Sequence, residues 1–219
     1  MGSGGEPIAL TESSARLASW LRLTKSFYAR DALTVARDLI GCLFVHIDRH
    51  GHLGVRVVET EAYRGHVDPG SHGYRGITPR TEVMYGPPGR LYVYFTYGMH
   101  WCANVVCGTD GDCEAVLLRA GEPVIGVDAM RANRPSVADP RLLASGPARM
   151  AKALGIDKRH NGASLLRGGT FFCAEDDRTV QMREGPVLQT KRIGLGAGRG
   201  DDLPWRFVVP GHPYASRRR

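Results

Sequence analysis

Lysine, metal-ligand cysteine spacing and long apolar runs are scarce or missing in this chain. Only four of its 29 basic residues are lysines (Lys25, Lys152, Lys158 and Lys191), so chemistry that requires an amine nucleophile has few candidates. The five cysteines show no CxxC spacing, which argues against zinc motifs and predicts reduced thiols in a cytosolic protein. No apolar run approaches the length of a membrane span, and the N-terminus lacks the apolar segment of a signal peptide, so we expect no membrane association.

What is present is an arginine-rich, globular composition. The 219 residues are 42% hydrophobic, and the formal charge is +7. This length suits one large domain or two small ones, and no internal repeat is visible. An excess of positive charge favours an anionic partner, most often nucleic acid. The predominance of arginine fits phosphate binding and stacking on rings, although a GC-rich genome would enrich arginine as well.

Hydrophobic periodicity predicts alternating short helices and strands. Residues 1–14 are expected to be a flexible leader, 15–216 the folded domain and 217–219 a basic tail. Helices are predicted at 15–23, from Asp31 or Thr34 to Ile40, at 126–133, and at 148–154 with Ser145 as its cap. Strands are predicted at 42–47, 54–63, 91–96, 101–107, 114–120, 170–174, 187–193 and 205–209.

The stretch Leu91–Asn104, LYVYFTYGMHWCAN, reads as a β-hairpin. Its first half alternates as strands do, and Gly98 permits the positive φ of a tight turn. Tyr97 and Met99 then stand at the tip, where side chains are normally small or polar. One interpretation is that Tyr97 folds back onto a core; the other is that it forms a wedge inserted between stacked flat rings.

A second group of polar residues lies on the predicted strand Gly54–Tyr63. Its two-residue period places on one face the side chains of Val57, Glu59, Glu61 and Tyr63. Carboxylates one strand step apart are roughly 6.6 Å from each other, and at an effective dielectric near 20 they repel by roughly 2.5 kcal/mol. The alternative is a solvated strand face, where this repulsion is small; if the face is buried, protonation of one carboxylate or an arginine nearby would relieve the cost. Arg119, which follows an apolar run, is the candidate, with Glu61 as its partner.

Two further segments have compositions typical of functional loops. Residues 64–88 are rich in glycine and proline and carry His66, His72, Tyr74, Arg75 and Arg80, groups that can contact a nucleic-acid backbone. Residues 192–200, RIGLGAGRG, are glycine-rich, but they do not form a GxGxxG between a strand and a helix. We therefore do not expect a dinucleotide site there.

Six motifs in this order carry a resemblance that covers nearly the whole chain, from about Phe27 to Ser216: VVETEAY, SHGYRG, PPGRLYVYFTYGMHWCANV, LLRAGEP, SGPARMAKALGI and RIGLGAG. Together they resemble the alkyladenine (3-methyladenine, or methylpurine) DNA glycosylase family. The resemblance implies a single α+β domain with a curved antiparallel sheet, flanking helices and a protruding hairpin. It also implies that alkylated or deaminated purines are flipped out of duplex DNA and excised.

The resemblance also implies roles for individual residues. Glu61 would activate the attacking water, and Arg119 would help to hold that water. Around the flipped base, the walls would be Tyr63, His72 and Tyr94. Asn104 would reject the amino group of normal guanine, and Tyr97, with Met99 beside it at the tip, would enter the DNA. The departures from the family pattern are Thr81, Glu82 and His100, and none of them is a catalytic position.

Residue types fit this chemistry, although two alternatives remain open. A cationic alkylpurine leaves readily, so a general base and a water suffice, and we expect no metal or other cofactor. No lysine lies in the ETEAY strand, in the loop after it or in the Tyr97 hairpin, so water rather than an amine should attack. We expect a monomer that acts on damaged double-stranded DNA inside the cell, in the cytoplasm or nucleoid of a bacterium or the nucleus of a eukaryote. The alternatives are a non-catalytic nucleic-acid-binding module and an RNA-modifying transferase.

Overall fold

The computed structural model describes residues 20–49 and 51–216, which form an α+β domain built on one antiparallel sheet. The strands are β1 (Leu21–Arg22), β2 (Leu43–Asp48), β3 (Gly51–Arg64), β4 (Leu91–Thr96), β5 (His100–Cys107), β6 (Glu114–Ile125), β7 (Phe171–Glu175), β8 (Leu188–Thr190) and β9 (Arg206–Val208). The α-helices are α2 (Lys25–Tyr28), α3 (Ala32–Asp38), α4 (Val127–Asn133), α5 (Pro147–Ala153) and α6 (Asp177–Glu184). Short 3₁₀ turns are η1 (Gly65–Val67), η2 (Glu82–Tyr85), η3 (Pro140–Leu142) and η4 (Lys158–His160).

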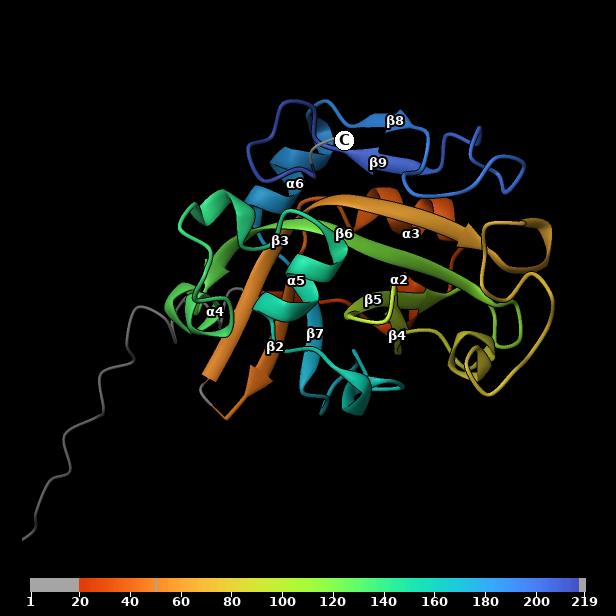
Figure 1. The fold of residues 1–219 in the computed structure, drawn as a ribbon, viewed down its shortest axis with the longest axis horizontal. Coiled ribbons are helices and arrows are strands. Elements are labelled where there is room, and N and C mark those ends of the chain that lie inside the picture. Colours follow the sequence, from red (N-terminus) through yellow and green to blue (C-terminus); the bar gives the residue numbers. More distant parts are fainter. Residues whose placement is uncertain (1–19, 50, 217–219) are drawn as a thin grey trace, which may run out of the picture.

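Strands β3 and β6 form the long centre of the sheet, whose order is β1-β7-β2-β3-β6-β5-β4 (Figure 1). Strand β3 pairs with β2 along its first half and with β9 along its second half, and β8 pairs with β9. Helix α3 packs behind β3 and β6, whereas α5 lies in front of the sheet and contacts β5 and β6. The segment of β3 that carries the two glutamates is therefore enclosed by β6 and β9.

Local sequence explains most of these elements. Asp31 caps α3 by accepting hydrogen bonds from the backbone of Leu33 and Thr34, and the helix ends before Gly41, whose φ is 83°. This helix buries Ala32, Val35 and Ala36 against the main core. Strands β2, β4, β5 and β7 follow the predicted ranges to within one residue, because their apolar runs are bounded by clear turn residues.

Several predicted elements are wrong at their ends or in their type. Leu21 and Arg22, expected in a helix, pair with β7 as strand β1, while residues 15–19, like the predicted leader and tail, lie outside the described residues. Strand β6 continues five residues past Ala120, and β8 is shorter than predicted. Ser145 does not cap α5; the N-cap is Gly146, and the Ser145 hydroxyl instead accepts from Arg149. Helix α6 was not predicted.

The β4–β5 hairpin is confirmed, and it forms the free edge of the main sheet. Thr96 pairs with His100, and the turn between them places Tyr97 at φ 50° and Gly98 at φ 65°. Two successive positive φ values define a type I′ turn, in which the first central residue is usually Asn, Asp or Gly. A tyrosine in this left-handed conformation is strained, and such strain is retained where the side chain serves a purpose.

No helix in the described part of the chain is both long enough and apolar enough to cross a bilayer.

Candidate active site

A cavity of about 410 Å³ opens beside the hairpin, between β3, β4, β5 and β6 and two loops. This volume lies within the range of small-molecule sites. One loop follows β3 and carries His72; the other is the glycine-rich segment that begins at Arg192. The cavity is lined by Tyr63, Gly70, His72, Met84, Tyr92, Tyr94, Thr96, Tyr97, Cys102, Asn104, Leu117, Arg119, Pro147, Ile193, Gly194, Leu195, Gly196 and Arg199.

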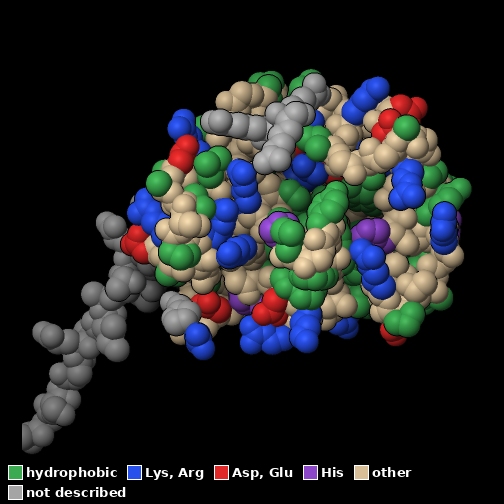
Figure 2. Space-filling view, viewed as in Figure 1, with side chains coloured by type: hydrophobic (Ala, Val, Ile, Leu, Met, Phe, Trp, Pro, Cys, Tyr) green, Lys and Arg blue, Asp and Glu red, His purple; other side chains and the backbone are tan. Residues whose placement is uncertain are grey.

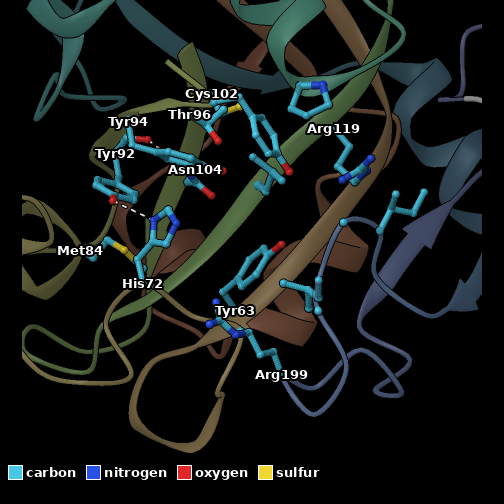
Figure 3. A pocket seen from close by; sticks show the side chains of 18 residues that line it. Tyr63, His72, Met84, Tyr92, Tyr94, Thr96, Cys102, Asn104, Arg119 and Arg199 are labelled. Carbon is cyan, nitrogen blue, oxygen red and sulfur yellow. Dashed lines mark hydrogen bonds between the residues drawn. The ribbon is translucent and has the colours of Figure 1, made fainter. Parts of the chain in front are cut away.

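Aromatic rings form two sides of this cavity. In Figure 3, Tyr63 lies across the space from His72 and Tyr94. The His72 ring meets the Tyr94 ring edge-on at 4.5 Å between centroids, and Tyr94 stacks on Tyr92 at 5.5 Å. Burial, and then the charge of Glu61, raise the pKa of Tyr63 well above its ordinary value, so its hydroxyl stays protonated. These walls suit a flat, uncharged or cationic ring.

His72 is held at the cavity mouth in its neutral form. Desolvation of the ring, reinforced by the nearby Arg80 guanidinium, lowers the pKa of His72 to about 4. Its Nε2 lies 3.5 Å from an Arg80 amino group, which can only donate, so Nε2 is the acceptor. Nδ1 therefore donates to the Tyr92 hydroxyl, at 3.0 Å. Sequence reasoning missed Tyr92 in this role, although it lies on the predicted strand.

Asn104 lines the cavity from β5 and is almost fully buried. Its amide nitrogen donates to the Tyr92 carbonyl oxygen at 3.2 Å, across the hairpin. That bond fixes the orientation of the amide, so a definite face of Asn104 meets any ligand in the cavity.

Glu61 lies directly behind the cavity wall, and its side chain is completely buried. Its Oε1 accepts from the Ile193 backbone N–H at 2.7 Å and lies 3.1 Å from an Arg119 amino nitrogen. Its Oε2 accepts from the Tyr63 hydroxyl at 2.9 Å. All three of these donor residues line the cavity. A buried carboxylate so close to an aromatic cavity is a candidate for acid–base chemistry.

Glu59 is the other buried carboxylate of β3, and it faces a different set of donors. Oε1 accepts from Arg119, Arg206 and the Ser216 hydroxyl at 3.0, 2.7 and 2.7 Å. Oε2 accepts from the Ser216 backbone N–H at 2.7 Å. Burial alone would raise the pKa of Glu59, but the charge of Arg119 and the hydrogen bonds from Ser216 lower it below its ordinary value. Glu59 is therefore ionised and saturated with donors.

Arg119 bridges the two glutamates, whereas the sequence predicted only Glu61 as its partner. Its Nε faces Glu59 and its Nη1 faces Glu61. Burial would lower its pKa, but the two carboxylates, Glu61 first, raise it. Register shifts in the β3–β6 ladder, on both sides of Glu59, interrupt the strict alternation that the sequence predicted and leave Arg119 without a Cα partner on β3. Such bulges redirect side chains next to active sites.

The hairpin tip projects into solvent beside the cavity. Tyr97 is 80% exposed and Met99 is 68% exposed. The interpretation that Tyr97 folds back onto a core is therefore wrong. Figure 2 shows a central ridge of hydrophobic side chains on this face, a hollow beside it and Lys and Arg side chains spread around. Among residues 20–49 and 51–216, no three His, Cys, Asp or Glu side chains could together hold a metal ion.

The fold and the cavity define an α+β protein with a tyrosine-walled cavity next to an exposed aromatic tip. Comparison with known proteins identifies the family. Residues 26–213 match the model of the methylpurine-DNA glycosylase family. A protein from Methanoculleus marisnigri is 48% identical over 199 residues, covering 90% of this chain and all of that protein. One from Carboxydothermus hydrogenoformans is 46% identical over 197 residues, covering 90% and 99%. Both carry the provisional name 3-methyladenine DNA glycosylase.

The chain therefore belongs to the methylpurine-DNA glycosylase family, which confirms the resemblance and makes it a hydrolase of the DNA glycosylase class.

Proposed function

We propose that this protein is a monofunctional glycosylase that flips alkylated or deaminated purines out of duplex DNA and hydrolyses their N-glycosidic bond. The substrates are of the 3-methyladenine, 7-methylguanine, hypoxanthine and ethenoadenine type. The observation that carries the proposal is the buried Glu61, whose three donors all line a tyrosine-walled cavity. Membership of a glycosylase family argues against a non-catalytic module or an RNA-modifying transferase.

In this proposal Glu61 is the general base. It removes a proton from a water on the cavity side while the damaged base departs, and its charge also stabilises the developing sugar cation. The two carboxylate oxygens of Glu61 are not equally occupied. Oε1 accepts from the Ile193 N–H and faces Arg119, whereas Oε2, within the part of the chain that the structure describes, accepts only from the Tyr63 hydroxyl, so Oε2 is the oxygen with capacity left to take a proton from a water.

The aromatic groups have two roles: some hold the flipped base, and others fill the gap that it leaves in the duplex. Rotating a nucleotide out of the duplex costs roughly a few kcal/mol, and an inserted side chain recovers part of that cost. Tyr97 and Met99, exposed at the tip, are the wedge. Tyr63, Tyr94 and His72 hold the base, and Asn104 rejects the exocyclic amino group of guanine. The positive charge of the chain attracts the backbone phosphates. The protein acts as a monomer, in the compartment that holds the DNA.

Excision from defined duplexes tests the proposal. Purified protein is incubated with 5′-labelled duplexes that contain one hypoxanthine or ethenoadenine, and strand cleavage is measured before and after alkali. We expect cleavage only after alkali, because a water nucleophile leaves an intact abasic site. Borohydride added during turnover should trap no protein–DNA adduct. No excision from either duplex would contradict the proposed function, and a trapped adduct at Lys191 would transfer the attack from water to an amine.

A further inference from the structure

Asp68 and Arg192 form an ion pair whose side chains are both completely buried. The contact is bidentate: Arg192 Nη1 lies 2.6 Å from Asp68 Oδ2, and Nη2 lies 2.7 Å from Oδ1. The two residues are 124 positions apart in the sequence. Neither belongs to the cavity lining, and neither has a part in the chemistry proposed above.

Arg192 and the residue after it are nevertheless connected to three consecutive residues of the catalytic strand. Its guanidinium donates to the Ala62 carbonyl oxygen at 3.0 Å and lies over the Tyr63 ring, 4.6 Å from the ring centroid. The next residue, Ile193, donates its backbone N–H to Glu61 at 2.7 Å. Fixing the Arg192 side chain therefore also fixes the wall ring of Tyr63 and one donor to Glu61.

Asp68 is in turn fixed by backbone hydrogen bonds. Its carboxylate accepts from the backbone N–H groups of Arg64 and Gly70, at 3.1 and 2.9 Å, at the start of the loop that carries His72. The surrounding chain approaches so closely that a Cβ on Gly70 or Gly200 would lie under 3 Å from the Arg192 guanidinium. The close approach of Arg192 therefore gives a reason for glycine at positions 70 and 200, where the sequence alone gave none.

We propose that the Asp68–Arg192 pair is a positioning device for Glu61 and Tyr63, an inference that rests on the proposed function. A fully buried ion pair is a poor source of stability, since desolvation of the charges offsets their attraction. What it does supply is a fixed geometry, because the bidentate fork allows only one arrangement. Through it, two loops are fastened to β3 at Ala62, Tyr63 and Arg64, the residues that directly follow the catalytic carboxylate.

The fold contains a matched control pair away from the cavity. Arg56 and Asp176 also form a bidentate contact, at 2.8 and 2.7 Å, and Arg56 also donates to a backbone carbonyl, that of Gly41. In both arginines the buried Nε lacks a partner among the described residues. The Arg56 pair joins α6 to β3 and touches none of the residues around Glu61. It therefore separates positioning from general stability.

The experiment compares R192K with R56K in the full-length protein. Both variants keep the positive charge and lose the fork. Single-turnover excision of hypoxanthine is measured from pH 5 to 8, with thermal unfolding in parallel. We expect R192K to lower the maximal rate at least about tenfold, and to move the acid limb of the pH–rate profile to higher pH, because a carboxylate that loses a donor binds a proton more readily. R56K should change the maximal rate by no more than about twofold, and it should leave the acid limb at the same pH.

A second variant leaves the ion pair whole, so that the test does not depend on the folding of R192K. An amide-to-ester replacement at residue 193 puts an oxygen in place of the N–H that is donated to Glu61 and leaves the side chains of Asp68 and Arg192 unchanged. It should move the acid limb in the same direction as R192K does. An unmoved acid limb in the ester protein, or equal effects of R192K and R56K, would overturn the positioning role. A wild-type protein without excision would instead defeat the proposed function itself.

Discussion

Two regions of this molecule depart in opposite ways from the usual rule that charged side chains are exposed and apolar ones are buried. Under the cavity, Glu59, Glu61 and Arg119 are charged and buried. At the hairpin tip, Tyr97 and Met99 are large, apolar and exposed. The buried charges each have several partners, whereas the tip residues pack against little. The comparison indicates that packing and pairing within the fold account for the first region, whereas packing within the described residues does not account for the second.

The largest effect should come from the buried region. Glu61→Gln removes the proposed general base, and excision should fall by about 10²- to 10⁴-fold. Binding to lesion-containing DNA should stay nearly unchanged, because the residue lies behind the cavity wall. Single-turnover excision and gel-shift titration measure the two quantities, with Glu122→Gln, an ion-paired glutamate of β6, as the charge-matched control. Activity within a few-fold of wild type would move the base to another residue.

Glu59→Gln should sharpen the contrast within the buried region. Glu59 faces two arginines and Glu61 faces one, so the loss of its charge should cost more stability. Breaking a buried pair costs about 3–5 kcal/mol, and about 2–4 °C of Tm per kcal/mol for a domain of this size gives a fall of about 10 °C. Excision by the folded variant should drop by less than that of Glu61→Gln. The opposite order of the two activities would exchange the roles of the glutamates.

At the exposed region the expected losses are confined to binding. Tyr97→Ala should weaken lesion affinity about tenfold, since one stacked aromatic contact contributes about 1–3 kcal/mol. Tm should hardly change, because the side chain is 80% exposed. Leu188→Ala, which truncates an exposed apolar residue on β8, is the control for both measurements. A large fall in Tm with unchanged affinity would show that the tip belongs to the core after all.

The smallest effect concerns His72, at the boundary of the two regions. Its pKa in the folded protein, about 4, lies below the ordinary value of 6.5. The unfolded chain therefore binds more protons between these values, and this contribution to stability is complete above pH 6.5 and is lost as pH falls toward 4. Because His72 is exposed at the cavity mouth, screening by solvent makes this contribution to stability small. His72→Gln should lower Tm slightly more at pH 7 than at pH 4.5, and an equal change at both would contradict the shift.

The sequence predicts the elements well and the connections between them poorly. The period of two in β3, β4 and β5 and the odd tyrosine at the turn are local signals, and both led to correct structure. The pairing of Asp68 with Arg192 and of Glu59 with Ser216 spans 124 and 157 residues, and no local pattern encodes either. The register shifts around Glu59 are invisible for the same reason, since they depend on two strands at once.

Where prediction of an element failed, tertiary pairing decided against local preference. Leu21 and Arg22 belong to a stretch whose apolar spacing predicts a helix, but in the structure they gain backbone partners on β7. Helix α6 did have a local signal that was overlooked: Asp176 and Thr179 form a reciprocal capping box at its start.

The contact of Ser216 with Glu59 also bears on how the protein comes to be folded. A chain leaves the ribosome N-terminus first, so Glu59 and Arg119 emerge long before Ser216 does. Until then the buried carboxylate of Glu59 lacks both the hydroxyl and the N–H that Ser216 later donates. The centre of the sheet is therefore completed by a segment that is synthesised 157 positions after Glu59, and until that segment emerges β3 carries its charges only partly matched.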